Sequence, residues 1–191
     1  NPTSVVAWKA VLASLGTGTE IPVVDPMTLN NRTEASKGYP LPRMLRANGT
    51  IDNGSIDNNL RWTGYRELDD EKLNDLAVRI VEQVRERGPF LSMSEFVNRR
   101  LLRSTDERST GGVLEMAIRE SGVNSITSGS GGQRFVTTTD ASNAGYTNTE
   151  AAVGNCEEGS NAFLSQGDIL ETLGNTLVVR SDTFVVRAYG E

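Results

Sequence analysis

Residues 68–102, LDDEKLNDLAVRIVEQVRERGPFLSMSEFVNRRLL, predict two helices joined by a tight turn. In the first helix, apolar residues recur at three- and four-residue steps, which places them on one face. These residues are Leu73, Leu76, Ala77, Ile80, Val81 and Val84. The opposite face is charged, and Asp75 and Arg79 have the i,i+4 spacing of a favourable ion pair. Either Asp69 or Asp70 is expected to cap the start of this helix.

The turn and the second helix carry signals of their own. A Gly-Pro dipeptide at 88–89 is expected to end the first helix, because glycine suits a helix C-cap and proline prevents continuation. Ser92 and Glu95 then have the spacing of an S-x-x-E capping box. The flanking residues Leu91 and Phe96 have the spacing of a hydrophobic staple. The stretch therefore predicts a helical hairpin.

The composition of the 191 residues excludes several kinds of chemistry. The chain has no histidine, which removes Ser-His-Asp catalysis, Cys-His catalysis and His-ligated zinc. Its one cysteine, Cys156, cannot form an internal disulfide, and the adjacent Glu157 and Glu158 are expected to raise its pKa. The lysines, at 9, 37 and 72, lie near no convincing serine motif. We therefore expect a protein that is not an enzyme, and we assign no catalytic, cofactor-binding or metal-ligating residue.

The net charge and the ends of the sequence limit which partners the protein is expected to have. A formal net charge of -6 argues against general attraction to nucleic acid or to anionic lipid. No apolar run reaches the length that a membrane helix needs, and no signal peptide is recognisable. The chain also lacks an initiator Met, so we interpret it as a fragment or a processed product. A membrane would then be contacted only through a missing upstream segment.

Around the hairpin, the N-terminal part is expected to be mainly helical. Residues 4–15 predict a short helix, capped by Thr3 or Ser4 and ended by Gly16. From residue 16 to residue 64 the chain is expected to be mostly irregular, apart from a strand at 21–24, because four prolines interrupt longer elements. A third helix is expected over 111–122, with Thr110 as its cap and Gly122 as its end.

The C-terminal part changes character twice. Residues 123–162 are rich in Gly, Ser, Thr and Asn and are expected to form a long polar loop, whose GSGG run lacks the context of a phosphate-binding loop. A helix is expected next, with a capping box of Ser165 and Asp168, a staple of Leu164 and Ile169, and an end at Gly174. Two strands are then expected, at 177–179 and 184–189. Arg187 and Tyr189, on the face opposite Phe184, are either a contact surface or a solvated face.

These elements together predict an α+β fold in a single domain or fragment, residues 1–191. It would comprise a small helical part with the helix-hairpin-helix-like pair (1–122), the polar loop (123–162), and a C-terminal helix with an antiparallel strand pair (163–191). The loop IDNGSIDNN at 51–59 is rich in oxygen ligands of the kind that hold Ca²⁺. Its spacing does not match the EF-hand pattern, and Asn-Gly is a common turn signal, so a plain turn is the preferred interpretation.

Several stretches of this chain resemble known motifs and families. QVRERGPFLSMSEFVNRR resembles half of a helix-hairpin-helix repeat, and TLVVRSDTFVVRAYGE resembles the closing strands of the K-type minor pseudopilin of type II secretion systems. A closer resemblance is to the C-terminal region of the Verru_Chthon cassette protein A family. It rests on NPTSVVAWKAVLASL, GPFLSMSEFVNRRL, GGVLEMAI, FLSQGDIL and RSDTFVVRAYGE, which span nearly the whole chain. The hydrophobic N-terminal pilin helix of the K-type pattern is absent here.

These resemblances imply a structural or assembly subunit of a pilus-like or type II secretion pseudopilus apparatus. Its partners would be other pilin-like or pseudopilin subunits, and its location would be extracytoplasmic, in the periplasm or cell envelope. The alternative is a helix-hairpin-helix module that binds nucleic acid, because Arg79–Arg103 contains six arginines against three glutamates. Local pairing of those arginines with glutamates explains the same stretch without nucleic acid.

Overall fold

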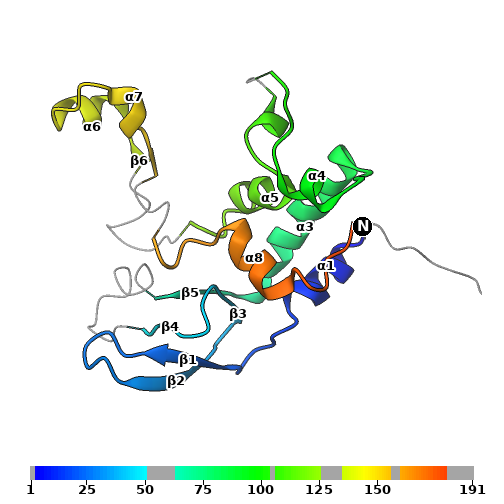
Figure 1. Cartoon of the computed structure of the whole chain (residues 1–191), viewed down its shortest axis with the longest axis vertical. Helices are drawn as coiled ribbons and strands as arrows, with labels where there is room; N and C mark the ends of the chain where they lie inside the picture. Colours follow the sequence, from blue (N-terminus) through cyan, green and yellow to red (C-terminus); the bar gives the residue numbers. More distant parts are fainter. Residues whose placement is uncertain (1–2, 51–62, 104–105, 126–134, 156–159, 180–191) are drawn as a thin grey trace, which may run out of the picture.

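The computed structural model describes residues 3–50, 63–103, 106–125, 135–155 and 160–179, and it confirms the expected α+β class (Figure 1). Its helices are α1 (Val5–Leu12), α3 (Asp70–Arg87), α4 (Met93–Val97), α5 (Val113–Ser121), α6 (Thr138–Asn143), α7 (Thr149–Ala152) and α8 (Gln166–Leu173). Its strands are β1 (Glu20–Val24), β2 (Asn31–Ala35), β3 (Tyr39–Pro42), β4 (Ala47–Asn48), β5 (Tyr65–Leu68), β6 (Phe135–Val136) and β7 (Gly154–Asn155).

Helix α3 is the centre of the main core. Asp69 caps it by accepting a hydrogen bond from the backbone N–H of Lys72 at 2.8 Å. The apolar face predicted from the sequence is buried, and it packs chiefly against α1 and α5, with α8 completing the cluster (Figure 1). Gly88 caps the C-terminal end, as predicted, with its N–H bonded to the carbonyl of Val84. The 18-residue helix is therefore held by packing on several sides.

The predicted helical hairpin is present, but its second helix is short, and the predicted hydrophobic staple between Leu91 and Phe96 does not form. Ser92 caps α4 by accepting from the N–H of Glu95 at 3.3 Å. The Glu95 carboxylate reaches back to the N–H of Leu91 at 2.7 Å instead of that of Ser92. Leu91 is 71% exposed, whereas Phe96 is buried. Phe96 packs against the rings of Trp8 and Phe90, so aromatic contacts fix α4 in place of the staple.

Helices α1 and α5 begin and end close to the predicted residues. Ser4 caps α1, which ends at Leu12, earlier than the sequence indicates. Gly112, and not Thr110, stands at the N-cap of α5, and the Thr110 hydroxyl donates to the sulfur of Met116 at 3.3 Å. Gly122 ends α5 in the left-handed conformation, at a φ of 66°, as a glycine C-cap does.

The expectation of a mostly irregular chain between residues 16 and 64 is wrong. The strand expected at 21–24 is present as β1, which pairs antiparallel with β2 and parallel with β4 in a sheet of order β2-β1-β4. Strands β3 and β5 form a second, two-stranded antiparallel sheet. The prolines did not prevent strands. Pro40 and Pro42 lie in β3, an edge strand, where a missing N–H is tolerated, and Pro22 lies in β1 at a position that exchanges no hydrogen bonds with β2. Both sheets lie beneath the helices in Figure 1.

The C-terminal expectations are partly wrong. Residues 135–155 form helices α6 and α7 and the small β6–β7 pair, with a capping box between Thr137 and Asp140, instead of a continuous loop (Figure 1). Helix α8 has the predicted capping box, staple residues and end. Leu177–Val179 is not a strand. The second expected strand, with Phe184, Arg187 and Tyr189, lies outside the described residues.

Candidate interaction groove

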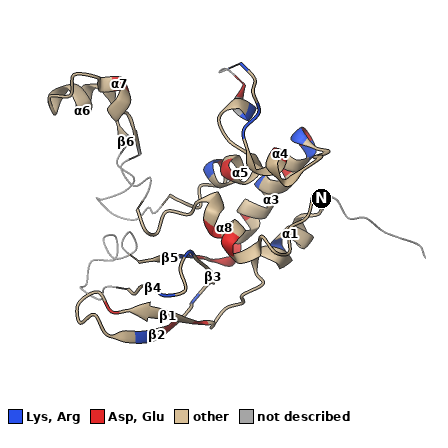
Figure 2. Cartoon of the chain, viewed as in Figure 1, with Lys and Arg blue, Asp and Glu red and all other residues tan. Residues whose placement is uncertain are grey.

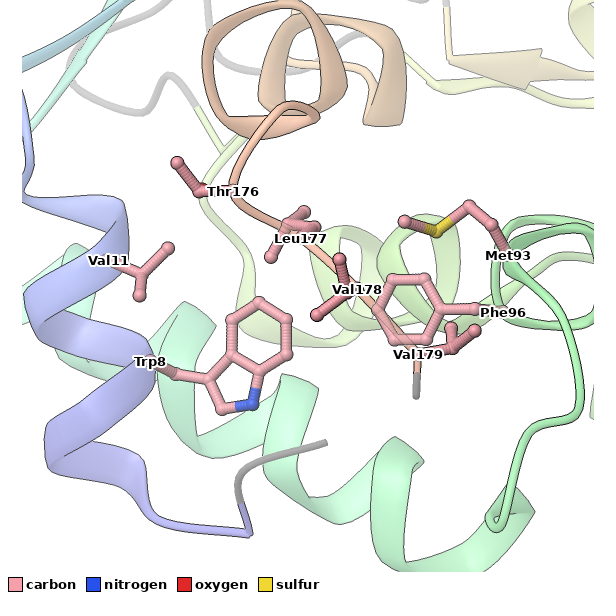
Figure 3. Close-up of a pocket in the computed structure, with 8 residues that line it drawn as sticks. All are labelled: Trp8, Val11, Met93, Phe96, Thr176, Leu177, Val178 and Val179. Atoms are coloured by element: carbon pink, nitrogen blue, oxygen red, sulfur yellow. The ribbon is translucent and has the colours of Figure 1, made fainter. Parts of the chain in front are cut away.

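An apolar groove of about 150 Å³ opens where α1, α4 and the segment after α8 meet (Figure 3). Its lining residues are Trp8, Val11, Met93, Phe96, Thr176, Leu177, Val178 and Val179. The rings of Trp8 and Phe96 lie parallel, at an interplanar angle of 3° and a centroid separation of 6.2 Å. Phe96 also meets Phe90 edge to face at 5.4 Å. These aromatic contacts give the groove a rigid base.

Each wall of the groove is positioned by a local feature of the sequence. Trp8 and Val11 are three residues apart on α1, so both face the same side of that helix. After α8, the Thr176 hydroxyl and backbone N–H both donate to the carbonyl of Leu173 at 2.8 Å, which directs the following residues across the core. Leu177 then packs against the core while Val178, next along the chain, is 62% exposed at the groove.

The described lining of the groove is mainly apolar, which suits binding of an apolar group. Among the residues that the structure describes, the lining residues carry no charge, and Thr176 is the only one with a side-chain oxygen. Its volume suits an apolar side chain of a partner better than a cofactor, because cofactor sites typically enclose about 300 Å³ or more. Sequence reasoning missed the groove, since it placed Trp8 and Val11 in the core and residues 177–179 in a sheet.

The arginines of Arg79–Arg103 are mostly engaged within the protein. Arg79 forms an ion pair with Glu82 at 2.9 Å, in place of the expected pair with Asp75. Arg87 is buried and donates to the carbonyl of Gly111 at 2.7 Å, and Arg100 donates to the carbonyl of Arg87. Burial lowers the pKa of Arg87. Figure 2 marks basic segments of the ribbon beside acidic ones.

A polar cluster at the sheets was also not found from the sequence. Glu34 on β2 accepts from the Tyr65 hydroxyl at 2.9 Å, from the Thr50 hydroxyl at 2.9 Å and from the guanidinium of Arg32. Burial alone would raise the pKa of Glu34, but these hydrogen bonds outweigh it and hold the pKa below its usual value. Because every oxygen of the carboxylate has a partner within the chain, the cluster is structural.

The described residues contain neither a metal-binding cluster nor a helix that could span a membrane. Within residues 3–50, 63–103, 106–125, 135–155 and 160–179, no group of three or more His, Cys, Asp or Glu residues is placed to hold a metal ion. In the same ranges, no helix is both long enough and apolar enough to cross a membrane. The candidate calcium loop at 51–59, the GSGG run and Cys156 lie outside the described residues.

Comparison with known proteins adds no assignment. No protein-family model, curated protein or solved structure matched the chain. The resemblances noted in the sequence therefore stay predictions, and the function is argued from the groove.

Proposed function

We propose that this chain is a non-enzymatic assembly subunit, and that it docks on a neighbouring subunit through the groove between α1, α4 and residues 176–179. The supporting observation is the groove beside the Trp8–Phe96 stack, whose described lining residues carry no charge. Aromatic residues in well-packed depressions are typical anchors of protein–protein interfaces. An apolar side chain of a partner would gain about 25 cal/mol for each Å² that it buries there.

The apparatus follows from the resemblance to pilin-associated families. In this proposal the apparatus is pilus-like or a type II secretion pseudopilus, and the partners are its pilin-like subunits. The location is then extracytoplasmic. Nucleic-acid binding is the second candidate, and the internal partners of Arg79, Arg87 and Arg100 weigh against it. A module that binds nucleic-acid phosphates needs arginines that are free to neutralise them.

Two valine substitutions test the docking. Val178→Asp places a charge in the groove at a residue that is already 62% exposed, so the fold should tolerate it. Val6→Asp is the matched control, because Val6 on α1 is 77% exposed and does not line the groove. We expect Val178→Asp to abolish capture of the pilin-like subunit that the proposal names as partner, and Val6→Asp to leave capture intact.

The same variants separate docking from folding. Both should keep the helical circular dichroism of the unaltered chain, since neither residue is buried. Equal capture by Val178→Asp and Val6→Asp would reject the groove as the docking site. Titration with duplex DNA at 50 and 200 mM salt tests the second candidate, for which affinity should fall steeply with added salt.

A further inference from the structure

Strand β2 leaves one hydrogen-bonding edge open among the described residues. The sheet order is β2-β1-β4, so β1 pairs with one side of β2 and no described strand pairs with the other. Figure 1 shows β2 along the outer margin of its sheet. Strands with open edges are templates for pairing with a further strand.

The register of β1 and β2 identifies which backbone groups face outward. Asp25 donates to the carbonyl of Asn30 at 2.8 Å, and Ser36 donates to that of Thr19 at 3.0 Å. In an antiparallel pair the hydrogen-bonded positions alternate, so Arg32 and Glu34 on β2 exchange bonds with β1. Thr33, which lies opposite Pro22, is at a position that exchanges no hydrogen bonds with β1. Its N–H and carbonyl therefore point away from β1.

Asn31 and Ala35 share this outward direction with Thr33, and none of the three is a proline. Strand β3 differs, because Pro40 and Pro42 remove two of its donors. The β2 edge thus carries a complete alternating row of donors and acceptors, whereas the β3 edge does not.

The sequence of β2 is Asn-Arg-Thr-Glu-Ala. When two copies of this strand lie antiparallel, their charged residues are complementary. With Thr33 on a two-fold axis, Arg32 lies opposite Glu34 of the second copy, and Glu34 opposite Arg32 of that copy. Opposite charges across a strand pair stabilise it, and like charges destabilise it. Parallel pairing in register would set Arg32 against Arg32 and Glu34 against Glu34.

We propose that two copies of this chain associate by antiparallel pairing of their β2 strands, with Thr33 at the two-fold axis. The two three-stranded sheets then become one continuous sheet across the axis. The outward groups of Asn31, Thr33 and Ala35 supply about six main-chain hydrogen bonds between the copies. This surface is separate from the groove, and the inference does not depend on the proposed function.

The charged side chains of β2 are already ordered by partners in their own copy. The Arg32 guanidinium binds Asp25 at 2.7 Å and the carbonyl of Thr50 at 2.8 Å, and it also binds Glu34. Tyr65 holds Glu34 from the adjoining sheet at 2.9 Å. Little side-chain freedom is therefore lost when the second copy arrives. The other face of β2, with Asn31, Thr33 and Ala35, is exposed and small enough not to obstruct it.

Substitution at the axis tests the pairing. Thr33→Pro removes the outward N–H but no donor to β1, because the Thr33 N–H does not face β1. Thr33→Ala is the matched control, since it keeps both backbone groups. By sedimentation equilibrium, we expect a dimer for the unaltered chain and for Thr33→Ala. For Thr33→Pro we expect the dissociation constant to rise about tenfold or more, as expected for the loss of two hydrogen bonds.

Cross-linking tests the register and does not depend on how well the proline variant folds. In a Cys156→Ser background, Thr33→Cys brings two thiols together at the axis, where opposed Cα atoms lie about 5.5 Å apart, within disulfide range. Asn31→Cys faces Ala35 of the second copy and should not cross-link with itself, but it should with Ala35→Cys. A monomer at all concentrations, or self-cross-linking of Asn31→Cys faster than that of Thr33→Cys, would overturn the proposal.

Discussion

Arg43 and Asp168, 125 residues apart in the chain, form a two-point ion pair between the end of β3 and the first turn of α8. The Arg43 Nε donates to Asp168 Oδ1 at 2.5 Å, and Nη2 donates to Oδ2 at 3.0 Å. The same Nη2 also donates to the carbonyl of Phe163 at 3.0 Å. Asp168 meanwhile accepts from the N–H of Ser165 at 2.7 Å, which completes the helix cap. One carboxylate thus caps α8 and ties it to the sheets.

We expect Asp168→Ala to lower the free energy of unfolding by about 2–3 kcal/mol, because it removes a cap and leaves Arg43 unpaired. Arg43→Ala should cost less, since Arg43 is partly exposed. In a double-mutant cycle measured by urea unfolding, the double mutant should lose less stability than the sum of the two single mutants, by about 1 kcal/mol or more. Arg46→Ala, at an exposed arginine nearby, should change stability by less than about 0.5 kcal/mol. If the two losses were strictly additive, Arg43 and Asp168 would not stabilise each other.

The α8 region illustrates what the sequence can and cannot predict. The capping box, the staple and the end at Gly174 depend on residues within about ten positions, and all three were predictable. The partner of Asp168 was not, because nothing local to Arg43 indicates which of the many distant carboxylates it meets. The pairing of Glu34 with Tyr65, 31 residues on, was hidden for the same reason.

Tyr65→Phe is expected to destabilise the protein more at neutral pH than in acid. The Tyr65 hydroxyl helps to hold the pKa of Glu34 below its usual value of 4.5, so its removal raises that pKa toward the unfolded value. Stability gained from a depressed carboxyl pKa is fully present above the unfolded pKa and is lost as the pH falls through the folded one. The cost should be about 1–2 kcal/mol at pH 7 and smaller at pH 3, measured by urea unfolding.

Tyr146→Phe is the control for this pH dependence, because Tyr146 lies in the exposed part of the α6–α7 region. It should change the unfolding free energy by less than about 0.5 kcal/mol at either pH. An equal cost of Tyr65→Phe at pH 7 and pH 3 would contradict the link between the hydroxyl and the ionised Glu34.

Leu29→Asn is expected to stabilise the β1–β2 turn. Leu29 has a φ of 59°, a left-handed conformation that costs a leucine about 1 kcal/mol and that asparagine adopts more readily. The side chain is 77% exposed, so little apolar burial is lost. We expect the unfolding free energy to rise by about 0.5–1 kcal/mol in urea titrations. Met27→Asn, in the same turn and 80% exposed but without a positive φ, should have almost no effect.

The sheets show a second limit of sequence reasoning. Strands β2 and β4 consist of polar or short segments without a clear apolar alternation, and β3 contains two prolines, so periodicity does not reveal them. The candidate groove was missed for a related reason. Its lining comes from three separated segments, and only the folded chain places Trp8, Phe96 and Leu177 together.

Gly112, the N-cap residue of α5, lies close to the backbone of Val97 at the end of α4, and its substitution should disrupt the packing of α4 on α5. A Cβ added there would lie 1.9 Å from the carbonyl oxygen of Val97, which is backbone and cannot rotate away. At the adjacent Gly111 an added Cβ would meet the side chain of Glu115 at 2.8 Å, and that side chain can move. We therefore expect Gly112→Ala to cost about 2–3 kcal/mol in thermal or urea unfolding, and Gly111→Ala much less. If the two alanines proved equivalent, α4 would not pack on the start of α5 as closely as the structure has it, and the groove wall formed by Phe96 would lose its support.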